Sequence, residues 1–156
     1  MQDVIRNAQG ERLDHTFHAG AREDSPIFVI GHGVTGHKDR PFLIALAEGL
    51  ARVGIAALRV SFSGNAGSEG RFEASNISRE VEDLGAVPDA LPNRVIGYAG
   101  HSMGGAAGVL RASRDPRIRY LVSLAAIVHT RAFAERAFGR LTPARRGFRT
   151  IHRHRP

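Results

Sequence analysis

The pentapeptide Gly100-His101-Ser102-Met103-Gly104 constrains this chain more than any other feature. An apolar run over 95–99 precedes it, and a segment with helical periodicity over 103–114 follows it. A serine at a sharp turn from strand to helix has strained dihedral angles, and its neighbours two positions away must be small. Gly100 and Gly104 meet that requirement. The sequence therefore predicts an exposed Ser102 hydroxyl beside the positive end of a helix, where an oxyanion would be stabilised.

The rest of the chain alternates strand and helix patterns, which is typical of an α/β fold with a mostly parallel sheet. The first 20 residues instead predict an antiparallel hairpin around the turn at 7–10. Further strands are expected over 27–31, 55–60, 95–99 and 120–127, and helices over 42–53, from about 78, over 103–114 and over 131–138. Pro88 is expected to kink or end the second helix near Val87. No linker divides residues 1–138, so we expect one domain there.

A second glycine-rich segment, Gly31-His32-Gly33-Val34-Thr35-Gly36, follows the first parallel strand, about 70 residues before Ser102. Together the two segments resemble the α/β-hydrolase superfamily, nearest its esterase, monoglyceride-lipase and serine-aminopeptidase-like members. The glycine-rich stretch 63–70 also resembles a loop of those relatives. The resemblance covers roughly residues 5–138.

This resemblance implies that Ser102 is the nucleophile and attacks an acyl carbonyl to form an acyl-enzyme. The backbone N–H groups of Val34 and Met103 would form the oxyanion hole. His32 would brace the Val34 loop, and Gly33, Gly100, His101 and Gly104 would support the site. The expected substrate is a small molecule with an ester or other acyl group, and no cofactor or metal is implied.

The resemblance also implies a catalytic acid and a histidine after the serine, on the family's seventh and eighth strands. Only 54 residues follow Ser102, and we expect both strands to be missing. Glu135 is the only acidic residue after Asp115, and His129 is the least unsuitable replacement base. We therefore expect a crippled serine hydrolase, with a catalytically inactive remnant or binding scaffold as the alternative.

The net charge of +7 is confined to the C-terminal part of the chain. Residues 131–156 contain eight arginines and one acidic residue, whereas residues 1–130 are balanced. The segment 139–156 has no helical or strand period, so it is interpreted as a disordered Arg-rich tail. A shifted reading frame is the favoured explanation, a solvated tail the second, and a nucleic-acid-binding tail the least favoured.

The chain has no cysteine, which excludes disulfides and thiolate metal sites and fits a cytoplasmic protein. No apolar run is long enough to span a bilayer. The apolar strand over 121–127 would lack its outer neighbour if the seventh strand is missing. That open edge predicts self-association.

Overall fold

A five-stranded mixed sheet organises the chain, in a computed structural model that describes residues 3–138. The strand order is β3-β5-β4-β6-β7, and only β3 is antiparallel to its neighbour. A separate hairpin pairs β1 with β2. The strands are β1 (Ile5–Arg6), β2 (Arg12–Leu13), β3 (His15–His18), β4 (Ile27–Gly31), β5 (Ala56–Val60), β6 (Ile96–His101) and β7 (Ile118–Leu124). The predicted α/β class, parallel sheet and N-terminal hairpin are confirmed.

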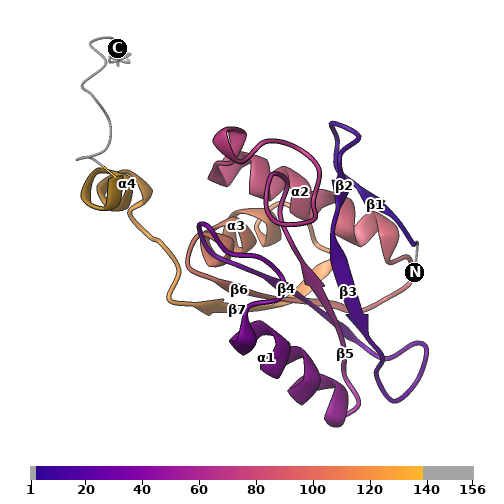
Figure 1. The fold of residues 1–156 in the computed structure, drawn as a ribbon. Coiled ribbons are helices and arrows are strands. Elements are labelled where there is room, and N and C mark those ends of the chain that lie inside the picture. The colour runs from indigo at the N-terminus through magenta and orange to yellow at the C-terminus, as the bar shows by residue number, and fades with distance from the viewer. Residues whose placement is uncertain (1–2, 139–156) are drawn as a thin grey trace, which may run out of the picture.

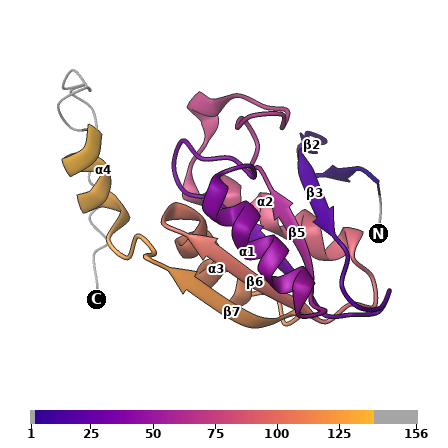
Figure 2. The same cartoon turned by 60° about the horizontal axis from the view of Figure 1, so that its bottom comes forward.

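Helices cover both faces of this sheet (Figure 1). Helix α1 (Pro41–Arg52) lies on one face, and α2 (Ile77–Ala90) and α3 (Met103–Ala112) lie on the other. A single 3₁₀ turn, Phe72–Ala74, precedes α2, and α4 (Thr130–Phe138) lies beyond the end of β7, away from the layers (Figure 2). None of the helices in residues 3–138 is long and apolar enough to cross a membrane.

The core is divided by the sheet into two parts of unequal size. The larger part lies under α2 and α3 and contains Val29, Leu58 and Tyr98, all almost fully buried. The smaller part packs Ile30 and Ala57 against α1. Because β4 lies between β5 and β6, the segments that follow these parallel strands meet at one edge of the sheet.

Several predicted boundaries differ in detail from the structure. Helix α2 continues through Pro88 to Ala90, because the proline lies in the last turn, where its missing N–H costs only one hydrogen bond. Strand β7 starts and ends earlier than predicted, and Ala125 just after it has a left-handed φ of 49° that interrupts the extended backbone. Phe42 on α1 and Val53 just after it share the helical spacing of the apolar positions, but these two residues are 45% and 73% exposed.

Strand β7 forms an open edge with unusually apolar side chains. Within residues 3–138, no strand pairs with its outer side. Four large apolar residues on it are at least 38% exposed: Tyr120, Leu121, Val122 and Leu124. The segment 139–156, which was interpreted as a disordered Arg-rich tail, lies outside the described residues.

Helix α2 carries two acidic residues, Glu80 and Asp83, that are almost fully buried. Asp83 accepts hydrogen bonds from Asn7 Nδ2 (2.8 Å) and from the backbone N–H of Ser63 (2.7 Å). Glu80, by contrast, has no hydrogen-bond partner for either carboxyl oxygen within the described part of the chain. Burial, together with the nearby charge of Asp83, raises the pKa of Glu80 to about 8.

Candidate active site

Ser102 is the single residue that joins β6 to α3, and its backbone is strained. Its φ of 55° and ψ of −117° lie in a region that a residue with a side chain rarely adopts, at a cost on the order of 1–3 kcal/mol. The Ser102 N–H donates to Leu124 O (2.9 Å), and Ser102 O accepts from Ala106 N and Ile127 N (both 3.2 Å). The predicted conformation is therefore confirmed, and both neighbouring segments hold it in place.

The two glycines of the pentapeptide leave no space for a side chain. A Cβ atom on Gly100 would lie 2.5 Å from Gly104 O, and one on Gly104 would lie 2.2 Å from His32 O. Backbone atoms cannot move aside as a flexible side chain can. Close packing of the turn on itself and on the His32 segment therefore requires glycine at both positions.

The segment after β4 lies directly against the serine. A Cβ atom on Gly33 would be 2.8 Å from Ser102 Cβ and 3.3 Å from Ser102 Oγ. The loop closes on itself through a hydrogen bond from Gly36 N to Gly33 O (2.9 Å). The structure thus brings together Ser102 and the Gly33–Val34 backbone, which are about 70 residues apart in sequence.

His32 is buried behind this loop, and both of its ring nitrogens are occupied. Its Nε2 accepts the Phe62 backbone N–H (3.0 Å), so Nδ1 carries the proton and donates to Gly33 O (2.8 Å). Burial is the main cause that lowers the pKa of His32 to about 4, so the ring is neutral near pH 7. A neutral ring with no free nitrogen can hold the Gly33 carbonyl, but it cannot accept a proton from Ser102.

The other candidate proton-transfer groups do not reach the serine. The His101 ring lies edge-on against Phe42 of α1, with centroids 5.1 Å apart. His129 is exposed beyond β7, and Glu135 on α4 forms an ion pair with Arg131 (3.0 Å). Within residues 3–138, no group forms a hydrogen bond with Ser102 Oγ, and no cluster of three acidic or histidine residues could hold a metal ion.

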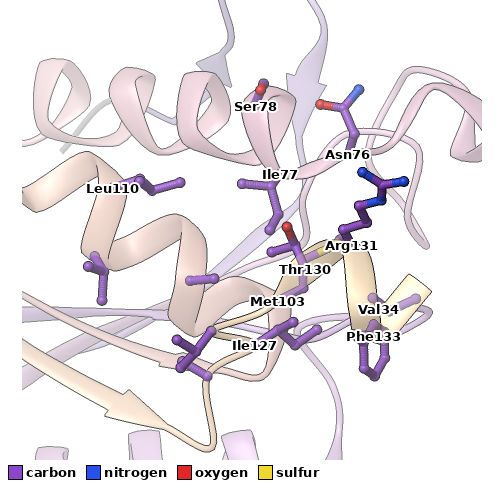
Figure 3. A pocket seen from close by; sticks show the side chains of 14 residues that line it. Val34, Asn76, Ile77, Ser78, Met103, Leu110, Ile127, Thr130, Arg131 and Phe133 are labelled. Atoms are coloured by element: carbon purple, nitrogen blue, oxygen red, sulfur yellow. The ribbon is translucent and has the colours of Figure 1, made fainter. Parts of the chain in front are cut away.

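A cavity of about 880 Å³ opens beside the turn (Figure 3). Val34 and Met103 line it, together with mostly apolar side chains from α2, α3 and the segment after β7. These include Ile77, Ala106, Val109, Leu110, Ala126, Ile127, Val128 and Phe133; Asn76, Ser78, Thr130 and Arg131 are the polar members. Sequence reasoning missed the cavity, although Ala106 and Leu110 follow Met103 at helical spacing and so share its face of α3.

Comparison with known proteins gives a consistent result. The family model for serine aminopeptidase, S33, matches residues 22–151. Est1E from Butyrivibrio proteoclasticus, solved with ferulic acid bound, is 27% identical with a TM-score of 0.78, and the match covers 86% of this chain and 57% of Est1E. A hydrolase from Pseudomonas aeruginosa PA01 is 22% identical with a TM-score of 0.70, over 91% of this chain and 53% of that chain. No curated protein matches this chain.

The chain therefore spans little more than half the length of these solved structures. The family match, however, covers most of its residues and includes both glycine-rich segments and the strained serine. On these grounds the chain belongs to the serine aminopeptidase-like family of the α/β-hydrolase superfamily.

Proposed function

We propose that this chain carries the nucleophile and the oxyanion hole of a serine hydrolase, with Ser102 as the attacking group. The observation that carries the proposal is the strained Ser102 turn with the Gly33 backbone packed against it. Strain of this kind persists where the surrounding structure enforces it, and it often accompanies function.

In the proposed reaction, Ser102 Oγ attacks an acyl carbonyl, and the carbonyl oxygen becomes an oxyanion. The backbone N–H groups of Val34 and Met103 stabilise that charge. Within residues 3–138, neither N–H donates to any other group, so both are available to a ligand. The loss of one such donor typically costs about 3–4 kcal/mol of transition-state stabilisation.

The proton of Ser102 needs an acceptor, and the described residues supply none that touches Oγ. In the proposed step the proton passes to solvent water as the bond from Oγ to the carbonyl carbon forms. The oxyanion then collapses to the acyl-enzyme, the ester C–O bond breaks, and the alkoxide leaves and takes up a proton from water. Serine proteases from which residues of the catalytic triad have been removed retain only about 10³–10⁴-fold acceleration over the reaction in water. The oxyanion hole and substrate binding provide this remainder. We accordingly propose slow acylation of Ser102 with little turnover for this chain. A protein that only binds ligands in the cavity, without acylation, is the competing function.

The proposed substrate is a small ester with an uncharged, apolar acyl group. The cavity beside Val34 and Met103 is lined mainly by aliphatic side chains, which favours such a group over a peptide. The cytoplasmic location and the absence of nucleic-acid binding remain predictions.

The test is labelling of Ser102 with an alkyl fluorophosphonate, together with the burst of p-nitrophenol from p-nitrophenyl acetate. The wild-type chain should take up one phosphonyl group and give a burst without rapid turnover, and Ser102→Ala should give neither. Ser113→Ala is the matched control, because the Ser113 hydroxyl donates to Leu110 O at the end of α3. Equal behaviour of wild type and Ser102→Ala would favour the binding function instead.

We also propose that the chain self-associates through β7. Its outer backbone groups have no strand partner within the described residues, and its exposed side chains are apolar. Edge strands of this kind pair readily with another chain. Light scattering should show a dimer or larger species, and a sharp monomer peak with two-state melting would exclude it.

A further inference from the structure

Tyr98 is a buried polar residue that neither the sequence motifs nor the proposed reaction explains. It lies on β6, four residues before Ser102, and its side chain is 1% exposed. Its hydroxyl donates a hydrogen bond to Gly104 O at 2.9 Å. Gly104 belongs to the first turn of α3, directly after Met103, whose N–H is one of the proposed oxyanion donors.

The same hydroxyl lies against the other side of the proposed oxyanion hole. A Cβ atom on Gly31 would be only 2.0 Å from the Tyr98 hydroxyl oxygen. Gly31 ends β4 and leads directly into the His32–Val34 loop. The Tyr98 side chain therefore contacts the backbone of Gly31, which precedes the Val34 N–H, and the backbone of Gly104, which follows the Met103 N–H.

The aromatic ring of Tyr98 has little room to move. Cβ atoms on Gly100 and Gly108 would lie 2.6 Å and 2.2 Å from the ring carbon Cε1. Glycines at these two positions create the slot that holds the ring. The position of the hydroxyl is thus determined by close contacts along the ring and by its hydrogen bond at the tip.

We propose that Tyr98 is a positioning residue, which sets the separation of the Val34 and Met103 N–H groups by joining Gly104 O to the end of β4. This inference rests on the proposed function of Ser102. It assigns to the hydroxyl a task that phenylalanine, with nearly the same shape, cannot perform.

The chemistry of the hydroxyl suits this task. Burial, reinforced by the nearby Glu80, raises the pKa of Tyr98 well above its ordinary value, so the group remains a proton donor. A buried hydroxyl is unfavourable unless it forms a hydrogen bond, and an apolar replacement would leave the Gly104 carbonyl with one bond fewer. A satisfied buried pair of this kind restricts the backbone to one arrangement.

The test compares Tyr98→Phe with Tyr120→Phe, which alters the chain's only other tyrosine, on the exposed strand β7. The rate constant for phosphonylation of Ser102 by the fluorophosphonate, in which an Oγ–P bond forms and fluoride leaves, should fall about fivefold to tenfold in Tyr98→Phe, the effect of one lost hydrogen bond. Reversible binding of an uncharged alkyl ligand to the cavity should change less than about twofold, because the lining residues are untouched. Labelling at the wild-type rate in Tyr98→Phe would overturn the proposal.

A second readout separates this inference from the proposed function. If the wild-type chain is not labelled at Ser102, the proposed function fails, and amide hydrogen exchange then decides the role of Tyr98. The amides of residues 104–108 should exchange faster in Tyr98→Phe than in wild type, and Tyr120→Phe should leave them unchanged. Unchanged exchange in both variants would refute a positioning role.

The contact with Gly31 gives an independent check. Gly31→Ala should lower the melting temperature strongly, because its new methyl group overlaps the Tyr98 hydroxyl. The same substitution should cost less in a Tyr98→Phe background, where the overlapping atom is absent. Equal losses in both backgrounds would contradict the contact on which the proposal depends.

Discussion

The buried carboxyl group of Glu80 should make the stability of the fold depend on pH. Burial and the charge of Asp83 raise its pKa from 4.5 to about 8, and neither oxygen has a partner within the described residues. Between these two values the folded chain keeps a proton that the unfolded chain releases. The stabilising contribution of the neutral group is therefore complete below pH 4.5 and is lost as the pH rises through about 8.

The magnitude follows from the size of this pKa difference. Each pH unit across the range costs the fold about 1.4 kcal/mol, which amounts to about 5 kcal/mol in total. Glu80→Gln keeps nearly the same shape but cannot ionise, so this cost disappears. The variant should thus resemble wild type near pH 4.5 and become more stable than wild type, by several kcal/mol, near pH 8.

The assay is urea unfolding of both chains at pH 5, 6, 7 and 8. The difference in free energy of unfolding between Glu80→Gln and wild type should grow steadily with pH, because the contributions of other titrating groups cancel. Glu82→Gln is the matched control, because it makes the same chemical change on the same helix at a side chain that is exposed and accepts a hydrogen bond from Gln9. Parallel pH profiles for Glu80→Gln and wild type would refute the reasoning.

Three further predictions follow from the site and the sheet edge. The stabilising contribution of neutral His32 is complete above pH 6.5 and is lost as the pH falls through about 4, which lowers the free energy of unfolding by about 3 kcal/mol. His32→Gln should not show this decrease when urea unfolding is measured at pH 7 and at pH 4. Gly33→Ala should reduce fluorophosphonate labelling more than tenfold while circular dichroism shows a folded chain, because the new methyl group would overlap Ser102 Cβ. Val122→Lys should shift light scattering toward monomer, since a charged side chain opposes edge pairing, whereas Val53→Lys on the far side of the sheet should not.

Local patterns predicted most of the fold. The predicted strand 27–31 has the same bounds as β4. The predicted helix 131–138 differs from α4 by one residue, because α4 already begins at Thr130. The strained backbone at Ser102 was also predictable, because a serine with a glycine two positions away on each side, between a strand and a helix, is typical of a sharp turn with strained dihedral angles. The catalytic role of Ser102 and the oxyanion roles of Val34 and Met103 remain predictions.

Features that depend on distant segments could not be predicted. Glu80 has the sequence context of a solvated acid near a helix start, yet it is almost fully buried in the folded domain. The partners of His32 come from its own neighbour Gly33 and from Phe62, thirty residues away. The Tyr98 contact with Gly31 likewise depends on the pairing of β4 with β6, which periodicity along the chain does not reveal.

A crystal structure of the chain after reaction with an alkyl fluorophosphonate would test the central claim most directly. The account predicts phosphorus bonded to Ser102 Oγ, with one phosphonyl oxygen about 2.7–3.1 Å from both the Val34 and the Met103 backbone nitrogens. A phosphonyl group on another residue, or an oxygen on Ser102 that points away from those two N–H groups, would contradict it.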